Sequence, residues 1–256
     1  MRIILDLSKS AQENAAYHYE RAKKLREKIK GAGEAIEKTK KELEIFKRES
    51  EKKPGVKIKR EKEWYEKFHW FFSSDGFLVI GGRDAKQNET IFSKYFEESD
   101  LFMHADVHGA PFVVIKNGPT APQKTLDEAA QFAANYSNAW KEELTTIDVY
   151  AAKKEQVSKH SHGEFVAKGG FVIKGERMWF KNVGLGAFIG ISQSGIECIP
   201  VKCGAGRFSA FAKIGPGGSE RSDVTKRLVK IFSKERGVYA DEVISLLPPG
   251  KSHIES

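Results

Sequence analysis

The stretch FHWFFSSDGFLVIGGRDAKQNE, residues 68–89, decides how the globular part of this chain folds. Two apolar runs rich in aromatic residues flank a Ser-Asp-Gly turn at 74–76, which is typical of a β-hairpin. The second run ends in two glycines at 81–82 and passes into a polar, helix-like segment that begins at 83–88. Glycines let a backbone come close to an anion, and the start of a helix offers free N–H groups. The stretch therefore predicts a hairpin followed by a helix whose start could hold an oxygen-rich ligand.

The same residues also allow a purely structural interpretation. Asp84 has the side chain of a helix N-cap, and Arg83 could form a salt bridge instead of a bidentate phosphate contact. The stretch has neither a GxGxxG pattern nor the Lys-Ser/Thr pair of a Walker A loop, so it does not by itself indicate nucleotide binding. A tight strand-to-helix turn and an anion site both stay open at this point.

Segments on the C-terminal side of this stretch alternate between strand-like and helix-like patterns. A helix is predicted after Thr125 and Glu128, which have the spacing of a capping box. Beyond residue 182 we expect a hairpin, a glycine-rich stretch, a basic amphipathic helix and a short closing helix. The fold class is therefore a mixed α/β (α+β) domain with a long N-terminal coiled-coil helix and a small C-terminal α/β extension. The helix, a basic linker, the globular domain and the extension are expected at 1–53, 54–63, 64–182 and 183–256.

The N-terminal segment has the pattern of one long coiled-coil helix. Ser10 and Glu13 form a capping box at its start, and apolar or small residues then recur in alternating steps of four and three. Gly31 and Gly33 each cost about 1 kcal/mol in a helix interior, but the seam keeps its phase across them. We therefore expect one helix over 10–52, whose uncovered seam predicts self-association or a missing partner helix. The seam consists of Ala15, His18, Ala22, Leu25, Ile29, Ile36 and Leu43.

The positive charge of the chain is concentrated at its N-terminus. The net charge is +8, and residues 1–63 contain 19 Lys or Arg against 12 Asp or Glu. Such a segment suits nucleic acid and equally a solvated helix. The two cysteines form no CxxC pair, which argues against a zinc site and fits a reducing cytoplasm. Because the sequence has no signal peptide and no run long enough to span a membrane, we expect a cytoplasmic protein without membrane contact.

No catalytic motif stands out in the sequence. HADVH could place His104, Asp106 and His108 on one face of an extended segment, where they could hold a metal, but a polar turn explains them as well. The GxSxG elbow of many hydrolases is missing. We expect no enzymatic activity, no metal and no cofactor.

Residues 153–181 combine cationic and aromatic side chains. They include seven Lys or Arg and three acidic residues, interleaved with histidine, phenylalanine and tryptophan. Cations neutralise phosphates and rings stack on unpaired bases, so the segment favours RNA binding. The aromatic residues could equally belong to a core, as alternating strand residues usually do.

Four strings of the sequence occur in an order that resembles a known module. They are residues 63–89, MHADVHGAPFVVIKNG (103–118), TLDEAAQFAANYSNAW (125–140) and QVSKHSHGEF (156–165). Together they are similar to NFACT-R, the RNA-binding module of the NFACT family of ribosome-quality-control factors. Residues 5–44 resemble the second long helix of that family's middle coiled coil, and the tail resembles the C-terminal extension of archaeal-type members. The family's N-terminal module and first coiled-coil helix have no counterpart in this sequence.

The resemblance implies a binding protein rather than an enzyme. Family members bind the large ribosomal subunit that carries an obstructed peptidyl-tRNA, and they recruit tRNA so that the nascent chain receives an untemplated C-terminal tail. The alternative is a scaffold that acts through the coiled coil without binding RNA, and a steep fall of RNA affinity with salt separates the two. From charge and expected exposure, the predicted RNA contacts are Arg83, Lys86, Gln87, Asn88, Lys154, Lys159, His160, Lys168, Lys174 and Arg177.

Overall fold

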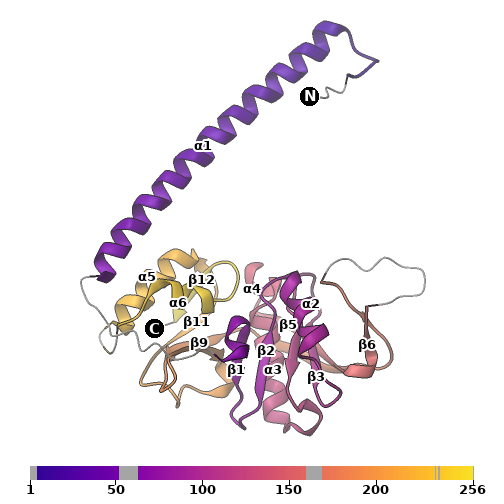
Figure 1. The fold of residues 1–256 in the computed structure, drawn as a ribbon, viewed down its shortest axis with the longest axis vertical. Coiled ribbons are helices and arrows are strands. Elements are labelled where there is room, and N and C mark those ends of the chain that lie inside the picture. Colours follow the sequence, from indigo (N-terminus) through magenta and orange to yellow (C-terminus); the bar gives the residue numbers. More distant parts are fainter. Residues whose placement is uncertain (1–4, 52–62, 160–168, 234, 236, 256) are drawn as a thin grey trace. The chain divides into compact units, whose positions relative to one another are not determined.

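The computed structural model describes residues 5–51, 63–159, 169–233, 235 and 237–255, without the side chains of 42–51. The chain divides into two compact units, residues 1–54 and 55–256, and each is described by itself (Figure 1). A long first helix followed by mixed helices and antiparallel sheets confirms the predicted fold class. Within the described ranges, no helix combines the length and the apolar character that a membrane crossing requires.

The first unit contains a single long helix, α1 (Ala11–Glu51), as predicted. Its start has the expected capping box. The Ser10 amide donates to the Glu13 carboxylate at 2.8 Å, and the Glu13 amide donates to the Ser10 hydroxyl at 3.2 Å. The helix passes through Gly31 and Gly33 without a break, as the unbroken phase of the seam predicted.

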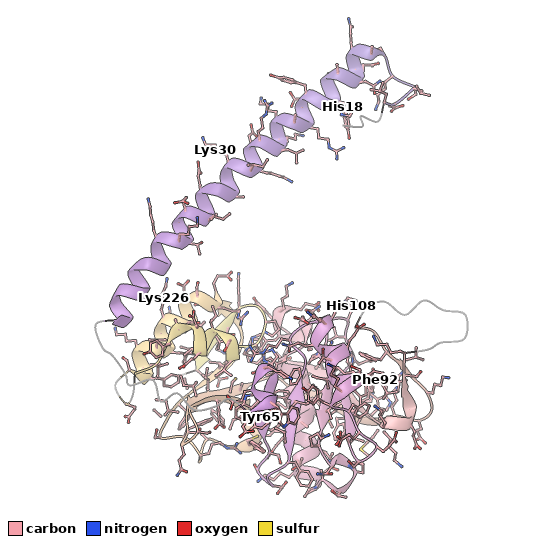
Figure 2. All side chains as sticks on the ribbon, viewed as in Figure 1. His18, Lys30, Tyr65, Phe92, His108 and Lys226 are labelled. Carbon is pink, nitrogen blue, oxygen red and sulfur yellow. The ribbon has the colours of Figure 1, made fainter. Side chains whose placement is uncertain are left out.

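The predicted seam of α1 is uncovered within this unit. Leu25, Ile29 and Ile36 are 51%, 71% and 55% exposed. Figure 2 shows side chains projecting along the helix, including that of His18. The side chain of Leu43 lies outside the described residues. Exposed apolar side chains at coiled-coil spacing leave the predicted self-association open.

A six-stranded antiparallel sheet forms the centre of the second unit, with the strand order β1-β2-β4-β3-β5-β8. β1 and β2 are the hairpin predicted from the first stretch, and Phe71 pairs with Val79 across it. The strands are β1 (His69–Phe72), β2 (Leu78–Gly81), β3 (Leu101–Ala105), β4 (Val113–Ile115), β5 (Thr146–Lys153) and β8 (Met178–Gly184).

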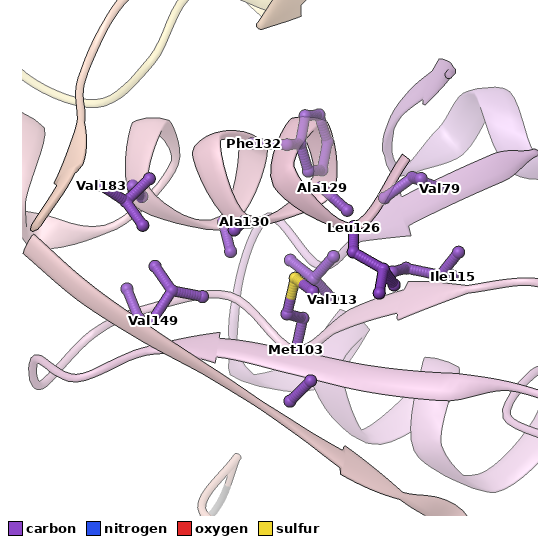
Figure 3. Close-up of a cluster of buried hydrophobic side chains, with 14 of the residues drawn as sticks. Val79, Met103, Val113, Ile115, Leu126, Ala129, Ala130, Phe132, Val149 and Val183 are labelled. Carbon is purple, nitrogen blue, oxygen red and sulfur yellow. The ribbon is translucent and has the colours of Figure 1, made fainter. Parts of the chain in front are cut away.

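Most of both faces of this sheet is covered. Phe132 of α3 and Met103 of β3 belong to the buried core on one face (Figure 3). Phe102 and Ile91 belong to a second core on the other face, beneath α2 and a two-stranded ribbon of β6 and β7. A ligand therefore reaches the sheet mainly at its ends and edges. The covering elements are η1 (Trp64–Lys67), α2 (Ala85–Lys94), α3 (Gln123–Asn135), β6 (Val157–Ser158) and β7 (Val172–Ile173).

The start of α3 differs from the prediction. Its N-cap is Pro122, so Thr125 and Glu128 form no capping box. Both side chains are fully buried and bind the turn of the β1–β2 hairpin. The Thr125 hydroxyl donates to the Asp75 carboxylate at 2.7 Å, and the Glu128 carboxylate accepts the Ser74 amide at 2.8 Å. The prediction was wrong because a tertiary contact recruits these polar groups, and a buried carboxylate needs hydrogen-bond donors.

A four-stranded sheet with the order β10-β9-β11-β12 forms the C-terminal part of this unit. The β9–β10 hairpin and the two helices α5 and α6 confirm the predicted elements of the extension. The helices pack on this sheet around a core that includes the fully buried Trp140 of α4. The elements are α4 (Asn138–Lys141), β9 (Ala187–Ile191), β10 (Ile196–Pro200), β11 (Ala210–Ser219), α5 (Arg221–Phe232), α6 (Ala240–Leu246) and β12 (Ser252–Glu255).

The predicted division at residue 182 falls inside β8. Val183 and Ile199, which follow that division, belong to the same core as α3. Trp140, which precedes it, donates its indole N–H to the Lys251 carbonyl at 3.0 Å. The two parts therefore pack as one body within the second unit.

Candidate functional site

A cleft of about 630 Å³ opens between the six-stranded sheet and the C-terminal helices. One wall comes from β1, β3, β5 and the turn before α2, and the other comes from the start of α5 and the segment around the end of α6. A cavity of this size suits a small-molecule-sized group. The lining residues that matter most for its chemistry are His69, Arg83, His104, Tyr136, Tyr150 and Arg221.

Two arginines give the cleft its charge. Arg83 donates to the Phe68 carbonyl at 3.0 Å, and Arg221 donates to the Ile244 and Leu247 carbonyls at 2.5 and 3.2 Å. Neither arginine forms an ion pair with an acidic residue that the structure describes. Desolvation lowers the pKa of both guanidinium groups, and the charge of Arg83 adds to this effect on the pKa of Arg221. Both remain charged at neutral pH.

Two neutral histidines lie on the same walls. Burial, and then the charges of the two arginines, hold the pKa of His69 well below its usual value. Burial lowers the pKa of His104 to about 4. The Nδ1 atoms of both rings and the Nε of Arg221 are buried and have no hydrogen-bond partner among the described residues. Buried polar atoms are normally bonded, so these three nitrogens indicate that a ligand or water completes the site.

The surroundings of the cleft are also electropositive. Ala85 is the first residue of α2 and Arg221 the first residue of α5, and both line the cleft, so the positive ends of two helix dipoles meet here. Asp84 is the one acidic side chain among the described lining residues. Its carboxylate acts as the N-cap of α2 and accepts the Gln87 amide at 2.8 Å. The cleft can therefore hold an anionic, oxygen-rich group.

Among the polar residues 83–88, which follow the two glycines, some line the cleft and some form hydrogen bonds that hold neighbouring backbone groups. Arg83 lines the cleft, and Lys86 is exposed on α2. The Gln87 side chain accepts the Arg83 amide and donates to a backbone carbonyl of η1. Asn88 is buried, and its side-chain oxygen accepts the Phe112 amide at 3.0 Å. Asn88 also lines the cleft, where its side-chain oxygen is already bound by the Phe112 amide.

Two of the predicted lysines also make contacts within the fold. The Lys154 ammonium donates to the Phe96 carbonyl at 2.6 Å and lies over the ring of the same residue. The Lys159 ammonium pairs with the Glu89 carboxylate at 2.5 Å. Neither lysine lines the cleft, so each would serve RNA only as a neighbouring charge.

Four predicted contacts remain, and all of them follow β6 in the sequence. Lys174 is exposed directly after β7. The Arg177 guanidinium lies 4.5 Å from the centroid of the Tyr150 ring, beside the cleft. His160 and Lys168 lie outside the described residues.

The HADVH motif contributes His104, Val107 and His108 to the cleft lining. His104 is on β3, and Asp106 and His108 follow in a bend and a turn. Within the described parts of the chain, no three His, Cys, Asp or Glu side chains form a group that could hold a metal ion.

Sequence reasoning missed several residues of the cleft, among them Arg221 and His69. Arg221 lies in a segment, residues 205–236, whose eight basic and three acidic residues were the available signal. Its distance in sequence from Arg83 gives no spacing rule that would join them. His69 lies among aromatic residues of a strand, and this pattern indicates core.

Comparisons with known proteins show one matching domain family and several relatives with similar sequences. Residues 67–175 match the family model described as "NFACT protein RNA binding domain". The archaeal Rqc2 homolog aRqcH of Methanocaldococcus jannaschii is 40% identical over 204 residues, which cover 77% of this chain and 30% of that protein. The ribosome quality control complex subunit NEMF of Homo sapiens is 38% identical over 174 residues, which cover 65% of this chain and 16% of that protein. The chain thus spans less than a third of the length of these two relatives.

A solved structure gives a weaker similarity. The C-terminal part of the fibronectin/fibrinogen-binding protein from Streptococcus suis is 21% identical, with a TM-score of 0.41 over 68% of this chain and 76% of that chain. A similarity at this level supports no argument about function.

Proposed function

Since the chain belongs to the NFACT family, we propose that its globular unit is the RNA-binding part of a ribosome quality control factor. In the whole factor, this unit contacts the RNA of a stalled large ribosomal subunit or of tRNA and supports C-terminal tailing of the nascent chain in the cytoplasm. The chain itself acts by binding and carries out no chemistry. The names of the relatives and of the matching domain support this proposal.

The single observation that carries the proposal is the unpaired positive charge of the cleft. Arg83 lies within the segment that matches the RNA-binding domain, and Arg221 adds a second guanidinium from α5. Because no described acidic side chain neutralises them, both charges are available to phosphate oxygens. Guanidinium groups bind phosphate through paired N–H donors, which is why arginine is favoured at such sites.

The test is the salt dependence of RNA binding by the full chain. Fluorescence anisotropy with a labelled RNA measures the affinity at increasing salt concentrations. Phosphate contacts release counterions, so the affinity should fall steeply with salt. Arg83→Gln and Arg221→Gln each keep a donor for the backbone carbonyls but remove the charge. Each should weaken binding and reduce the salt slope by roughly 0.7 for a single strand.

Arg227→Ala is the matched control, because Arg227 is exposed on α5 and does not line the cleft. It should leave both affinity and slope close to those of the wild type. Affinity that is flat between low and moderate salt would contradict RNA binding. Equal losses from all three arginine variants would contradict the cleft as its location. Cosedimentation of the full chain with purified large ribosomal subunits tests the partner directly.

For α1 we propose pairing with a second helix of the same kind, either in another copy of the chain or elsewhere in the whole factor. The exposed Leu25, Ile29 and Ile36 support this proposal, since a helix cannot bury such a seam alone. If pairing were the whole function, the chain would be a scaffold without affinity for RNA, and the anisotropy measurement would show no binding.

A further inference from the structure

Three aromatic side chains lie side by side across three neighbouring strands. His104 on β3 is the register partner of Tyr150 on β5, and Tyr150 is the register partner of Trp179 on β8. The ring centroids are 5.8 and 5.3 Å apart along this row. His104 and Tyr150 line the cleft, whereas Trp179 lies on the edge strand β8 and is 40% exposed. The aromatic row therefore runs from the cleft to the open edge of the sheet.

Two cationic side chains lie against rings of the aromatic row. The Arg177 guanidinium lies 4.5 Å from the Tyr150 centroid, and the Lys181 ammonium lies 4.2 Å from the Trp179 ring. Arg177 forms no ion pair with a described residue. Lys181 is bound by the Asp148 carboxylate at 2.8 Å, so its charge is partly compensated. The row thus offers exposed ring surface beside one uncompensated positive charge.

We propose that the aromatic row binds unpaired RNA nucleotides by stacking, and that it leads one of them into the cleft. Bases in a duplex are stacked on each other and are not free to lie against a protein ring, so the partner is a single strand. A phosphate of the strand is held by Arg83 and Arg221, and a neighbouring base lies on the exposed face of Trp179. This inference rests on the proposed RNA binding and specifies the class of RNA.

A row of rings across a sheet also stabilises strand pairing, and the alternative is that it does nothing more. The exposure of Trp179 argues against that alternative. Trp140, which serves a core, is fully buried, and its indole N–H is bonded. Trp179 instead leaves two fifths of its surface in solvent beside Tyr150 of the cleft wall, where a structural tryptophan gains little.

Trp64 offers a matched control for Trp179. It is 41% exposed, almost the same as Trp179. It lies on η1 and stacks on Tyr95 with a centroid distance of 4.7 Å and an interplanar angle of 4°, so one face of its ring is already covered. It belongs to neither the cleft lining nor the aromatic row. A loss of hydrophobic surface alone would affect both variants in the same way.

The experiment compares Trp179→Ala and Trp64→Ala in the full chain against two labelled probes, a 12-nucleotide single-stranded RNA and the duplex of the same sequence. Fluorescence anisotropy gives the affinities. Because Trp179→Ala removes the ring on which one base stacks, it should lower the affinity for the single-stranded probe roughly tenfold or more. Trp64→Ala should change neither affinity, and Trp179→Phe should retain most of the single-strand binding. Thermal unfolding of each variant checks that it is folded.

The outcomes separate this inference from the proposed function. If Trp179→Ala binds the single strand as the wild type does, or loses affinity for both probes equally, the stacking row is overturned while RNA binding stands. If the wild type binds neither probe, both proposals are overturned. Selective loss of the single strand, restored by Trp179→Phe, supports the row. Quenching of tryptophan fluorescence by the single strand in the wild type, absent in Trp179→Phe, supports it independently.

Discussion

Replacing Asn88 with Ala is expected to destabilise the fold. The Asn88 side-chain oxygen accepts the Phe112 amide at 3.0 Å, and the two residues are 9% and 1% exposed. Without the acceptor, a buried N–H has no partner, which costs about 1–3 kcal/mol. For a chain of this size, a loss of about 2 kcal/mol lowers the midpoint of thermal unfolding by roughly 4–8 °C. Calorimetry on the full chain, with denaturant unfolding as a second measure, gives both quantities.

Lys86→Ala is the control for this prediction, because Lys86 lies two residues earlier in α2 and is exposed. Its unfolding free energy should stay within about 0.5 kcal/mol of the wild type. The reasoning is refuted if Asn88→Ala unfolds like the wild type but loses affinity for RNA. That result would mean that the carboxamide is available to a ligand and that the Phe112 amide does not depend on it.

Three further outcomes are expected. Stability should fall between pH 7 and pH 5, because the pKa of both buried histidines is lower in the folded than in the unfolded state; the share of His104, with a pKa of about 4 when folded and near 6.5 when unfolded, is about 2 kcal/mol in denaturant unfolding, and His104→Asn should remove that share while the share of His69 stays. Leu25→Glu should shift the full chain towards monomer in sedimentation velocity without changing the unfolding of the globular unit, and a monomeric wild type would contradict self-association. Gly82→Ala should lower the thermal midpoint, since its Cβ would lie 2.8 Å from the Asn88 backbone nitrogen; an unchanged midpoint would show that the turn can shift at no cost.

Features set by neighbours in the sequence were predictable. The capping box at Ser10 and the phase of the α1 seam depend on residues within one or two turns, and the helix forms as predicted. The Ser-Asp-Gly turn likewise fixes the β1–β2 hairpin. At Thr125 the local rule failed, because the hairpin turn supplies hydrogen-bond partners that are distant in sequence. The N-cap is then Pro122, which has an extended backbone and makes no side-chain capping hydrogen bond.

The cleft could be predicted only in part. Arg83 was found because glycines and a helix start mark its surroundings in the sequence. Arg221 approaches it only through the packing of α5 and the second sheet against the rest of the unit, and no periodicity records that contact. His69 lies opposite Gly81 in the predicted hairpin, but its place among aromatic strand residues indicated core. The sequence also does not show which polar side chains are exposed. Asn88 and Lys154 were predicted to be free for RNA, but in the structure each forms a hydrogen bond with a backbone group. Charge alone therefore overstates the number of side chains that remain available to a ligand.

The C-terminal extension belongs to the binding unit rather than following it. The match to the RNA-binding domain ends at residue 175, but the cleft draws Arg221 from α5. Tyr136, within that match, donates its hydroxyl to the Leu246 carbonyl at 2.7 Å and lies on the cleft wall. A boundary at 175 or 182 would open the core around Trp140 and remove one of the two guanidinium groups. The charge that distinguishes the cleft exists only where both segments are folded together, so affinity for RNA should be sought in a chain that keeps them both.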